Sequence, residues 1–145
     1  MLHLHDIESG YGAGQVIFGV SLSVPAGRVV SLMGRNGMGK TTTIRAIMGQ
    51  LPLTAGRISR FGNDQPNQLP FQIARLGLGL VPEGRQIFSN LDVTENLKTF
   101  YRPPHDDGGS HWHYERVLDL FPRLAERRDH AGNHLSGGEQ QMLAI

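Results

Sequence analysis

The 145-residue sequence has no cysteine, which excludes a disulfide framework, a thiolate metal site and a thiol nucleophile. It also has almost no net charge, because its 14 Lys and Arg residues are nearly balanced by 13 Asp and Glu residues. A balance of +1 gives no electrostatic footprint for nucleic acid or an anionic membrane, so any bound anion must be held locally. No run approaches the roughly 18 apolar residues of a membrane span, and the first residues lack the pattern of a signal peptide. These absences fit a soluble chain in a reducing compartment.

Glycine, in contrast, is abundant. The 19 glycines are about 13% of the chain, roughly twice the ordinary share, and they form short groups rather than a periodic pattern. Collagen and low-complexity linkers are therefore excluded, whereas glycine-rich functional loops are not. The length suits one domain that buries roughly 70% of its unfolded surface.

Hydrophobic patterning predicts a mixture of strands and helices. Alternation at residues 2–7 and 16–24 indicates half-buried antiparallel strands. Short apolar runs at 28–33 and 78–81 indicate strands buried on both faces. Further elements are expected as a strand at 57–61 and helices at 41–49, 68–75, 94–101 and 140–145, with an irregular loop at 102–110. An apolar stripe predicts an amphipathic helix broken or kinked at Pro122, and it consists of Tyr114, Val117, Leu118, Phe121 and Leu124.

A phosphate-binding pattern follows the strand expected at 28–33. Residues 34–41 read GRNGMGKT and match G-x-x-x-x-G-K-[ST] between a predicted strand and a predicted helix. Glycines let successive backbone N–H groups point inward at phosphate oxygens, and the helix N-terminus adds partial positive charge. Lys40 would reach the terminal phosphates, and the Thr41 hydroxyl would help coordinate magnesium. A glycine-rich turn with an incidental lysine is the alternative, at a chance of about one in 200 from average composition.

A second motif lies near the other end of the sequence. Residues 135–141 read LSGGEQQ and place a hydroxyl and two glycines before a helical segment, which also suits an anion. Taken alone, the motif could be only a capping box between Ser136 and Glu139.

Together the two motifs resemble the nucleotide-binding subunit of an ATP-binding cassette (ABC) transporter. The resemblance implies an α/β P-loop nucleotide hydrolase fold of the ABC ATPase type, with an antiparallel β subdomain and a helical signature subdomain at about 83–140. It implies ATP and Mg²⁺ as cofactors, with adenine stacking on Tyr11, which could otherwise be a strand-end aromatic covering the sheet. ATP is expected to contact Tyr11 and the Walker A residues Gly34, Arg35, Asn36, Gly37, Met38, Gly39, Lys40, Thr41 and Thr42.

The resemblance also implies partners. The signature residues of one subunit are expected to meet ATP held by a second ABC ATPase subunit, identical or different, and they are Leu135, Ser136, Gly137, Gly138, Glu139 and Gln140. Transmembrane permeases are further partners, and a periplasmic solute-binding protein is an indirect one. The subunit would lie in the cytoplasm, on the inner face of the cytoplasmic membrane. Ile87 and Phe88 would either be core residues or face the permease.

A finer resemblance concerns the stretches 81–97, which read VPEGRQIFSNLDVTENL, 117–128 and 135–145. They are similar to the second ATPase subunit of branched-chain amino-acid uptake systems, whose relatives import urea and short amides. Most cassette ATPases carry glutamine where this chain has Glu83, the residue expected beside Thr41 at magnesium. Glutamate there favours branched-chain amino acids.

The sequence departs from the family after the signature. The family continues into a strand ending in Asp and Glu and then a switch histidine, so residues 1–145 resemble a nucleotide-binding domain truncated after its signature. We therefore expect no catalytic base in this chain and exposure of Val29, Val30 and Leu32. An ATP-binding module without turnover stays an alternative to the transport ATPase, and a soluble ATPase of repair or translation is a third possibility.

The histidines are expected to be solvated loop residues. His105, His111 and His113 cluster near the predicted loop without an acidic pair at metal-ligand spacing. His134 is interpreted as a loop residue rather than a catalyst.

Overall fold

The computed structural model describes residues 2–101 and 112–145, and the loop expected at 102–110 therefore lies outside the described residues, as do His105 and His111. The chain divides into two compact units, Met1–Leu80 and Val81–Ile145. Each unit has its own hydrophobic core, so each is described by itself.

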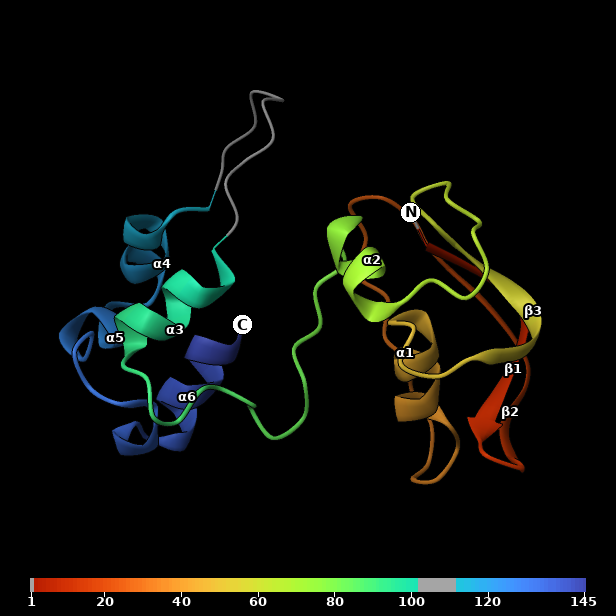
Figure 1. The fold of residues 1–145 in the computed structure, drawn as a ribbon, viewed down its shortest axis with the longest axis horizontal. Coiled ribbons are helices and arrows are strands. Elements are labelled where there is room, and N and C mark those ends of the chain that lie inside the picture. Colours follow the sequence, from red (N-terminus) through yellow and green to blue (C-terminus); the bar gives the residue numbers. More distant parts are fainter. Residues whose placement is uncertain (1, 102–111) are drawn as a thin grey trace. The chain divides into compact units, whose positions relative to one another are not determined.

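The first unit contains a three-stranded antiparallel sheet (Figure 1). Its strands are β1 (Leu2–Tyr11), β2 (Gly14–Val24) and β3 (Leu53–Arg60), in the spatial order β2-β1-β3. The strands predicted at 2–7 and 16–24 are confirmed, and both extend toward the turn between Tyr11 and Gly14. The third strand begins earlier than the expected 57–61 because residues 53–56 also pair with β1.

Two helices complete this unit, α1 (Lys40–Ile47) and α2 (Pro70–Arg75). The helix α2 falls within the predicted range 68–75, whereas α1 begins one residue before the predicted range 41–49 and ends two residues before its end. Gly49 follows α1 at a φ of 68°, as a terminating glycine does. The sheet and both helices share one apolar core, which consists of Leu4, Ile7, Ile17, Ala46, Ile47, Met48, Ile58 and Ile73. This packing fixes α1 against the strands, so its N-terminus has a defined place in the unit.

The buried strands predicted at 28–33 and 78–81 are wrong. Neither segment is a strand, and Val29 and Met33 are 97% and 86% exposed. A central parallel strand needs hydrogen-bonding neighbours, and the strands in the described part of the chain are all committed to one antiparallel sheet. The expected exposure of Val29, Val30 and Leu32 is confirmed.

The second unit is helical (Figure 1). It contains α3 (Val93–Phe100), α4 (Tyr114–Leu120), α5 (Pro122–Glu126), the 3-10 helix η1 (Gly132–His134) and α6 (Gly137–Ala144). The predicted break at Pro122 is confirmed, since α4 ends at Leu120 and α5 begins at the proline. The core of this unit consists of Val93, Leu124, Leu135 and Leu143, and Ile87 packs against it. None of the helices in residues 2–101 and 112–145 has the length and apolar character needed to cross a bilayer.

Candidate functional site

The loop at 34–41 has the backbone conformation expected of a phosphate cradle. Gly37 and Gly39 adopt φ values of 83° and 84°, in the left-handed region that favours glycine. A Cβ on Gly37 would meet no atom within 4 Å, so its backbone conformation rather than crowding requires glycine there. Gly39 is also the N-cap of α1 and provides no side-chain hydrogen bond to the helix. The first N–H groups of α1 are therefore available to an anion.

Lys40 lies across this loop. Its Nζ donates to the carbonyl oxygens of Gly34 and Arg35, each at 2.8 Å. These two hydrogen bonds hold the Lys40 ammonium group against the loop at 34–41, and both are exposed to solvent. The geometry can therefore supply a cation and several N–H donors to one phosphate group.

The residues present fit a magnesium nucleotide on the side of α1. Thr41 is exposed in the first turn of α1, where its hydroxyl is a hard oxygen ligand of the kind that Mg²⁺ prefers. Arg35, Asn36 and Met38 are exposed loop residues. Thr43, in contrast, is buried, and its Oγ1 donates to the Gly39 carbonyl at 2.9 Å. This bond ties α1 to the end of the loop.

Tyr11 is connected to the same helix. Its hydroxyl accepts a hydrogen bond from Arg45 Nη1 at 3.1 Å, and the Arg45 guanidinium lies 5.9 Å from the ring centroid. A side-chain hydrogen bond with Thr42 lowers the pKa of Tyr11, and Arg45 adds to this effect. Thr42 is buried beside Tyr11, whereas Tyr11 is 45% exposed. An aromatic face is thus available next to α1.

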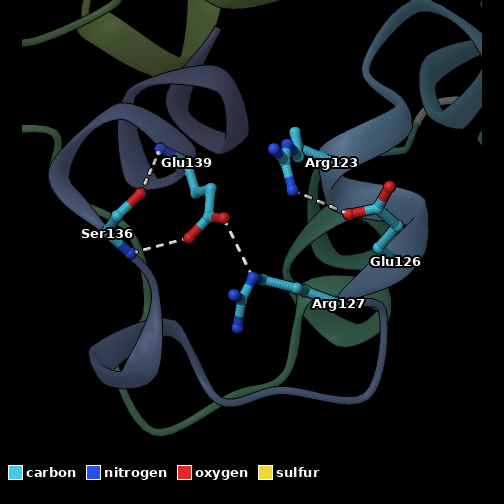
Figure 2. Close-up of polar contacts among 5 residues, drawn as sticks. All are labelled: Arg123, Glu126, Arg127, Ser136 and Glu139. Carbon is cyan, nitrogen blue, oxygen red and sulfur yellow. Dashed lines mark hydrogen bonds and ion pairs between the residues drawn. The ribbon is translucent and has the colours of Figure 1, made fainter.

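In the second unit, the motif at 135–141 forms a capping box. Ser136 is the N-cap of α6, and its Oγ accepts from the Glu139 N–H at 3.3 Å. Glu139 Oε2 in turn accepts from the Ser136 N–H at 2.8 Å (Figure 2). The alternative raised by the sequence, a capping box, is therefore present. Gly138 has open space around it, which leaves room near the start of α6.

An ion pair joins this capping box to Arg127, the C-cap residue of α5. Arg127 Nε lies 2.9 Å from Glu139 Oε1, and the Glu139 side chain is only 12% exposed (Figure 2). The Ser136 N–H lowers the pKa of Glu139 most, followed by the Ser136 side chain and then Arg127. The carboxylate is therefore stabilised in its charged form at the helix N-terminus.

Arg85 and Gln140 make further contacts with the motif. The Arg85 guanidinium lies 3.0 Å from where a Cβ on Gly137 would be, so a side chain at that position would displace it. Arg85 Nη1 also donates to Gln140 Oε1 at 3.4 Å, and Gln140 Nε2 donates to the Gly132 carbonyl at 2.9 Å. Leu135 is buried in the core of this unit. The motif is thus held from both of its ends.

The remaining residues singled out by the sequence lie apart from these contacts. Glu83 is exposed in the second unit, before a turn in which Gly84, Arg85 and Gln86 all have positive φ. His113 caps α4, where its Nδ1 accepts from the Arg116 N–H at 3.3 Å, and His134 ends η1. No group of three potential metal ligands occurs among residues 2–101 and 112–145.

Sequence reasoning missed Asn96, Arg127 and Arg85. Asn96 is 2% exposed and holds the turn at residues 88–92 through four side-chain hydrogen bonds. Phe88 is 44% exposed and stacks on Phe100 at a centroid distance of 5.7 Å, whereas Ile87 belongs to the core. The sequence offered only one hint for Asn96, a polar residue within a predicted helix, because its hydrogen-bond partners lie up to eight residues away.

Comparison with known proteins assigns the chain that carries these two motifs to a family. A family model described as ABC transporter matches residues 17–145. The chain belongs to the ABC transporter family. The cassette is 38% identical over 147 residues to the high-affinity branched-chain amino acid transport ATP-binding protein BraG of Pseudomonas aeruginosa, with 100% of this chain and 62% of BraG covered. It is 34% identical to the lipopolysaccharide export system ATP-binding protein LptB of Escherichia coli, over 97% of this chain and 58% of LptB.

Solved structures of ABC cassettes agree with this assignment. A structure of an ATP binding subunit of an ABC transporter superposes with a TM-score of 0.80 and 30% identity, over 99% of this chain and 59% of that one. The ABC cassette described here thus spans about three fifths of the length of the relatives it matches. The α/β fold of the ABC ATPase type, predicted from the sequence, is confirmed.

Proposed function

We propose that this cassette binds Mg²⁺-ATP as part of an ATPase subunit that drives import of branched-chain amino acids. One observation carries the nucleotide assignment: Lys40 and the uncapped first turn of α1 converge on the loop at 34–41. A cation and free backbone N–H groups at one turn are complementary to a polyphosphate. The proposal treats residues 1–145 as one nucleotide-binding domain with a helical subdomain at about 83–140.

Each side chain at the loop then has a role. Backbone N–H groups from Gly34 to Thr42 surround the phosphates, and Lys40 exchanges its loop carbonyl acceptors for phosphate oxygens. Tyr11 offers its ring to adenine, and its bond to Arg45 keeps the ring beside α1. Thr41 would supply a hydroxyl ligand to magnesium, Glu83 is proposed as a further ligand, and the metal would neutralise charge on the phosphates.

The signature at 135–140 acts on ATP held by a second ATPase subunit. An anion-binding helix N-terminus with Ser136 as its N-cap supports this role, as does the open space around Gly138. The resulting dimer docks on transmembrane permeases at the cytoplasmic face of the membrane, and a periplasmic protein delivers the solute to those permeases.

Branched-chain amino acids are the favoured solutes because BraG, a branched-chain amino acid transport ATP-binding protein, is 38% identical to this chain. The resemblance at Glu83, where most cassette ATPases carry glutamine, favours the same solutes. The match to LptB favours a second candidate, the ATPase of an exporter. Deleting the gene in its host should lower uptake of labelled leucine, isoleucine and valine. Unchanged uptake of all three would exclude the importer assignment while leaving ATP binding untouched.

ATP binding itself is tested with Lys40→Ala. Losing a charge-assisted partner of the phosphates should raise the Kd for Mg²⁺-ATP at least about tenfold in equilibrium titration. Lys98→Ala is the matched control, since Lys98 lies on α3 near Tyr114 and should leave the Kd unchanged. An unchanged ATP affinity in Lys40→Ala would remove the assignment of the loop.

A further inference from the structure

The first unit contains a cavity that does not belong to the phosphate loop. It has a volume of about 470 Å³ and lies between the C-terminal end of α1, strand β3 and residues 64–69. Ligand pockets commonly enclose roughly 300–1,000 Å³, so this cavity has room for a small organic molecule. Three of its polar residues, Arg60, Asp64 and Gln68, differ in charge and in what they can bind.

Arg60 contributes a buried cation to this cavity. It is 5% exposed, and its Nε and Nη2 donate to the carbonyls of Ile47 and Ala46 at 2.9 and 3.4 Å. Burial lowers the pKa of Arg60, which nevertheless remains charged at neutral pH. Within residues 2–101 and 112–145 it forms no ion pair, and its Nη1 has no hydrogen-bond acceptor. Nη1 is therefore a donor suited to a carboxylate.

Gln68 contributes the opposite chemistry. The residue is 8% exposed, and in the described part of the chain its Oε1 is the buried side-chain atom without a hydrogen-bond partner. A buried acceptor without a donor is unfavourable and is rare in folded proteins. Asp64, which is exposed, lines the same cavity and adds a carboxylate. This side of the cavity thus favours a ligand that carries N–H donors, and a positive charge on that ligand would suit Asp64.

The lining also includes the apolar side chains Leu51, Pro52, Leu53, Ile58 and Leu69 and the exposed polar side chains Thr54, Arg57, Gln65 and Asn67. A ligand that uses all three surfaces must combine a carboxylate, an ammonium group and a hydrocarbon body in a small volume. We propose that this cavity binds a free α-amino acid with an apolar side chain, whose carboxylate meets Arg60 and whose ammonium group meets Gln68 and Asp64. This site is separate from the ATP-binding loop and does not depend on the proposed function.

A ligand series tests the proposal on the chain without nucleotide. L-leucine should bind saturably in calorimetric titration, with a Kd below about 1 mM. Three probes each lack one feature: 4-methylpentanoate has no ammonium group, 3-methylbutylamine has no carboxylate, and glycine has no hydrocarbon side chain. Each should bind about tenfold more weakly or worse. No saturation by leucine up to 10-fold above that Kd would overturn the proposal and leave only water in the cavity. Equal binding of leucine and the three probes would also overturn it, because the contacts assigned to the ammonium group, the carboxylate and the side chain would then not select the ligand.

Variants locate the binding in the cavity. Gln68→Leu should raise the Kd for leucine roughly ten- to hundredfold, because the ammonium group loses its buried acceptor. Gln50→Leu makes the same change at an exposed glutamine outside the cavity and should leave the Kd unchanged. Gln68→Glu restores an acceptor and should bind leucine at least as tightly as the unchanged chain. Wild-type affinity in Gln68→Leu, or lost binding in a folded Gln68→Glu, would place leucine elsewhere and overturn the assignment.

Discussion

Replacing Asn96 by alanine removes the side chain that organises the turn between Glu83 and α3. Asn96 Oδ1 accepts from the Phe88 N–H at 2.9 Å. Its Nδ2 donates to the carbonyls of Phe88, Leu91 and Asp92 at 3.0, 3.1 and 2.9 Å. Because Asn96 is 2% exposed, water does not readily replace these bonds. We therefore expect the variant to destabilise the second unit.

The magnitude depends on which groups keep another partner. The carbonyls of Phe88, Leu91 and Asp92 also accept from the N–H groups of Leu91, Gly132 and Asn96, at 3.2, 2.9 and 2.9 Å. Only the Phe88 N–H loses its sole acceptor among the described residues. An orphaned donor costs about 1–3 kcal/mol and each further lost bond roughly 1 kcal/mol or less, so the free energy of unfolding should fall by about 2–4 kcal/mol.

Urea unfolding followed by amide NMR signals of residues 81–145 measures this loss, and hydrogen exchange at the Phe88 amide locates it. Asn90→Ala is the control, because Asn90 is exposed in the same turn and should change stability by less than about 0.5 kcal/mol. Asn96→Asp keeps the acceptor for Phe88 but turns a carboxylate toward three carbonyls, so it should be at least as damaging. A loss below about 1 kcal/mol in Asn96→Ala, with an unchanged exchange rate at Phe88, would refute the reasoning.

Two further predictions concern the signature helix α6. Ser136→Arg should abolish ATP-dependent dimerisation, measured by light scattering, by filling the space before α6 while ATP still binds the loop of each monomer. Equal loss of monomer ATP affinity in Ser136→Arg and Lys40→Ala would contradict the division between the two motifs. Arg127→Gln should raise the pKa of Glu139 in a carboxyl NMR titration, though not to its usual range, because the Ser136 N–H remains. Because the pKa of Glu139 is lowered in the folded state, its charged form stabilises the fold at pH values above the usual carboxyl pKa, and this stabilisation is lost as pH falls through the folded-state pKa. Arg127→Gln should therefore lose the stabilisation at a higher pH than the unchanged chain. Arg123→Gln, whose ion-pair partner is Glu126, should not shift the pKa of Glu139 (Figure 2).

Local patterns in the sequence predicted the parts of the fold that depend on near neighbours. The glycine loop at 34–39, the helix that follows it and the break at Pro122 are encoded by residues within one or two turns of one another. The capping box of Ser136 and Glu139 is equally local, with a spacing of three residues. Conformational preference and periodicity are sufficient for such features.

Distant partners account for what the sequence did not reveal. The segment at 28–33 has the composition of a buried strand, but composition does not state whether a neighbouring strand is available to pair with it. Arg60 lies in the strand expected at 57–61, yet its side chain reaches carbonyls 13 and 14 residues earlier at the end of α1. Arg127 and Glu139 meet only because α5 and α6 pack together. Tertiary packing determines these contacts, and the periodicity of a single segment does not indicate which distant segment it packs against.

The Ser136 hydroxyl can both accept and donate a hydrogen bond, and the N-cap uses it only as an acceptor. A hydroxyl oxygen has two lone pairs and one proton, and the bond from the Glu139 N–H occupies a lone pair. The proton stays free to be donated to an anion in front of α6. Aspartate is as good an N-cap as serine, but it has no proton to give at neutral pH and would repel a phosphate. Selection for helix stability alone would therefore not distinguish the two residues, whereas selection for contact with an anion would retain serine.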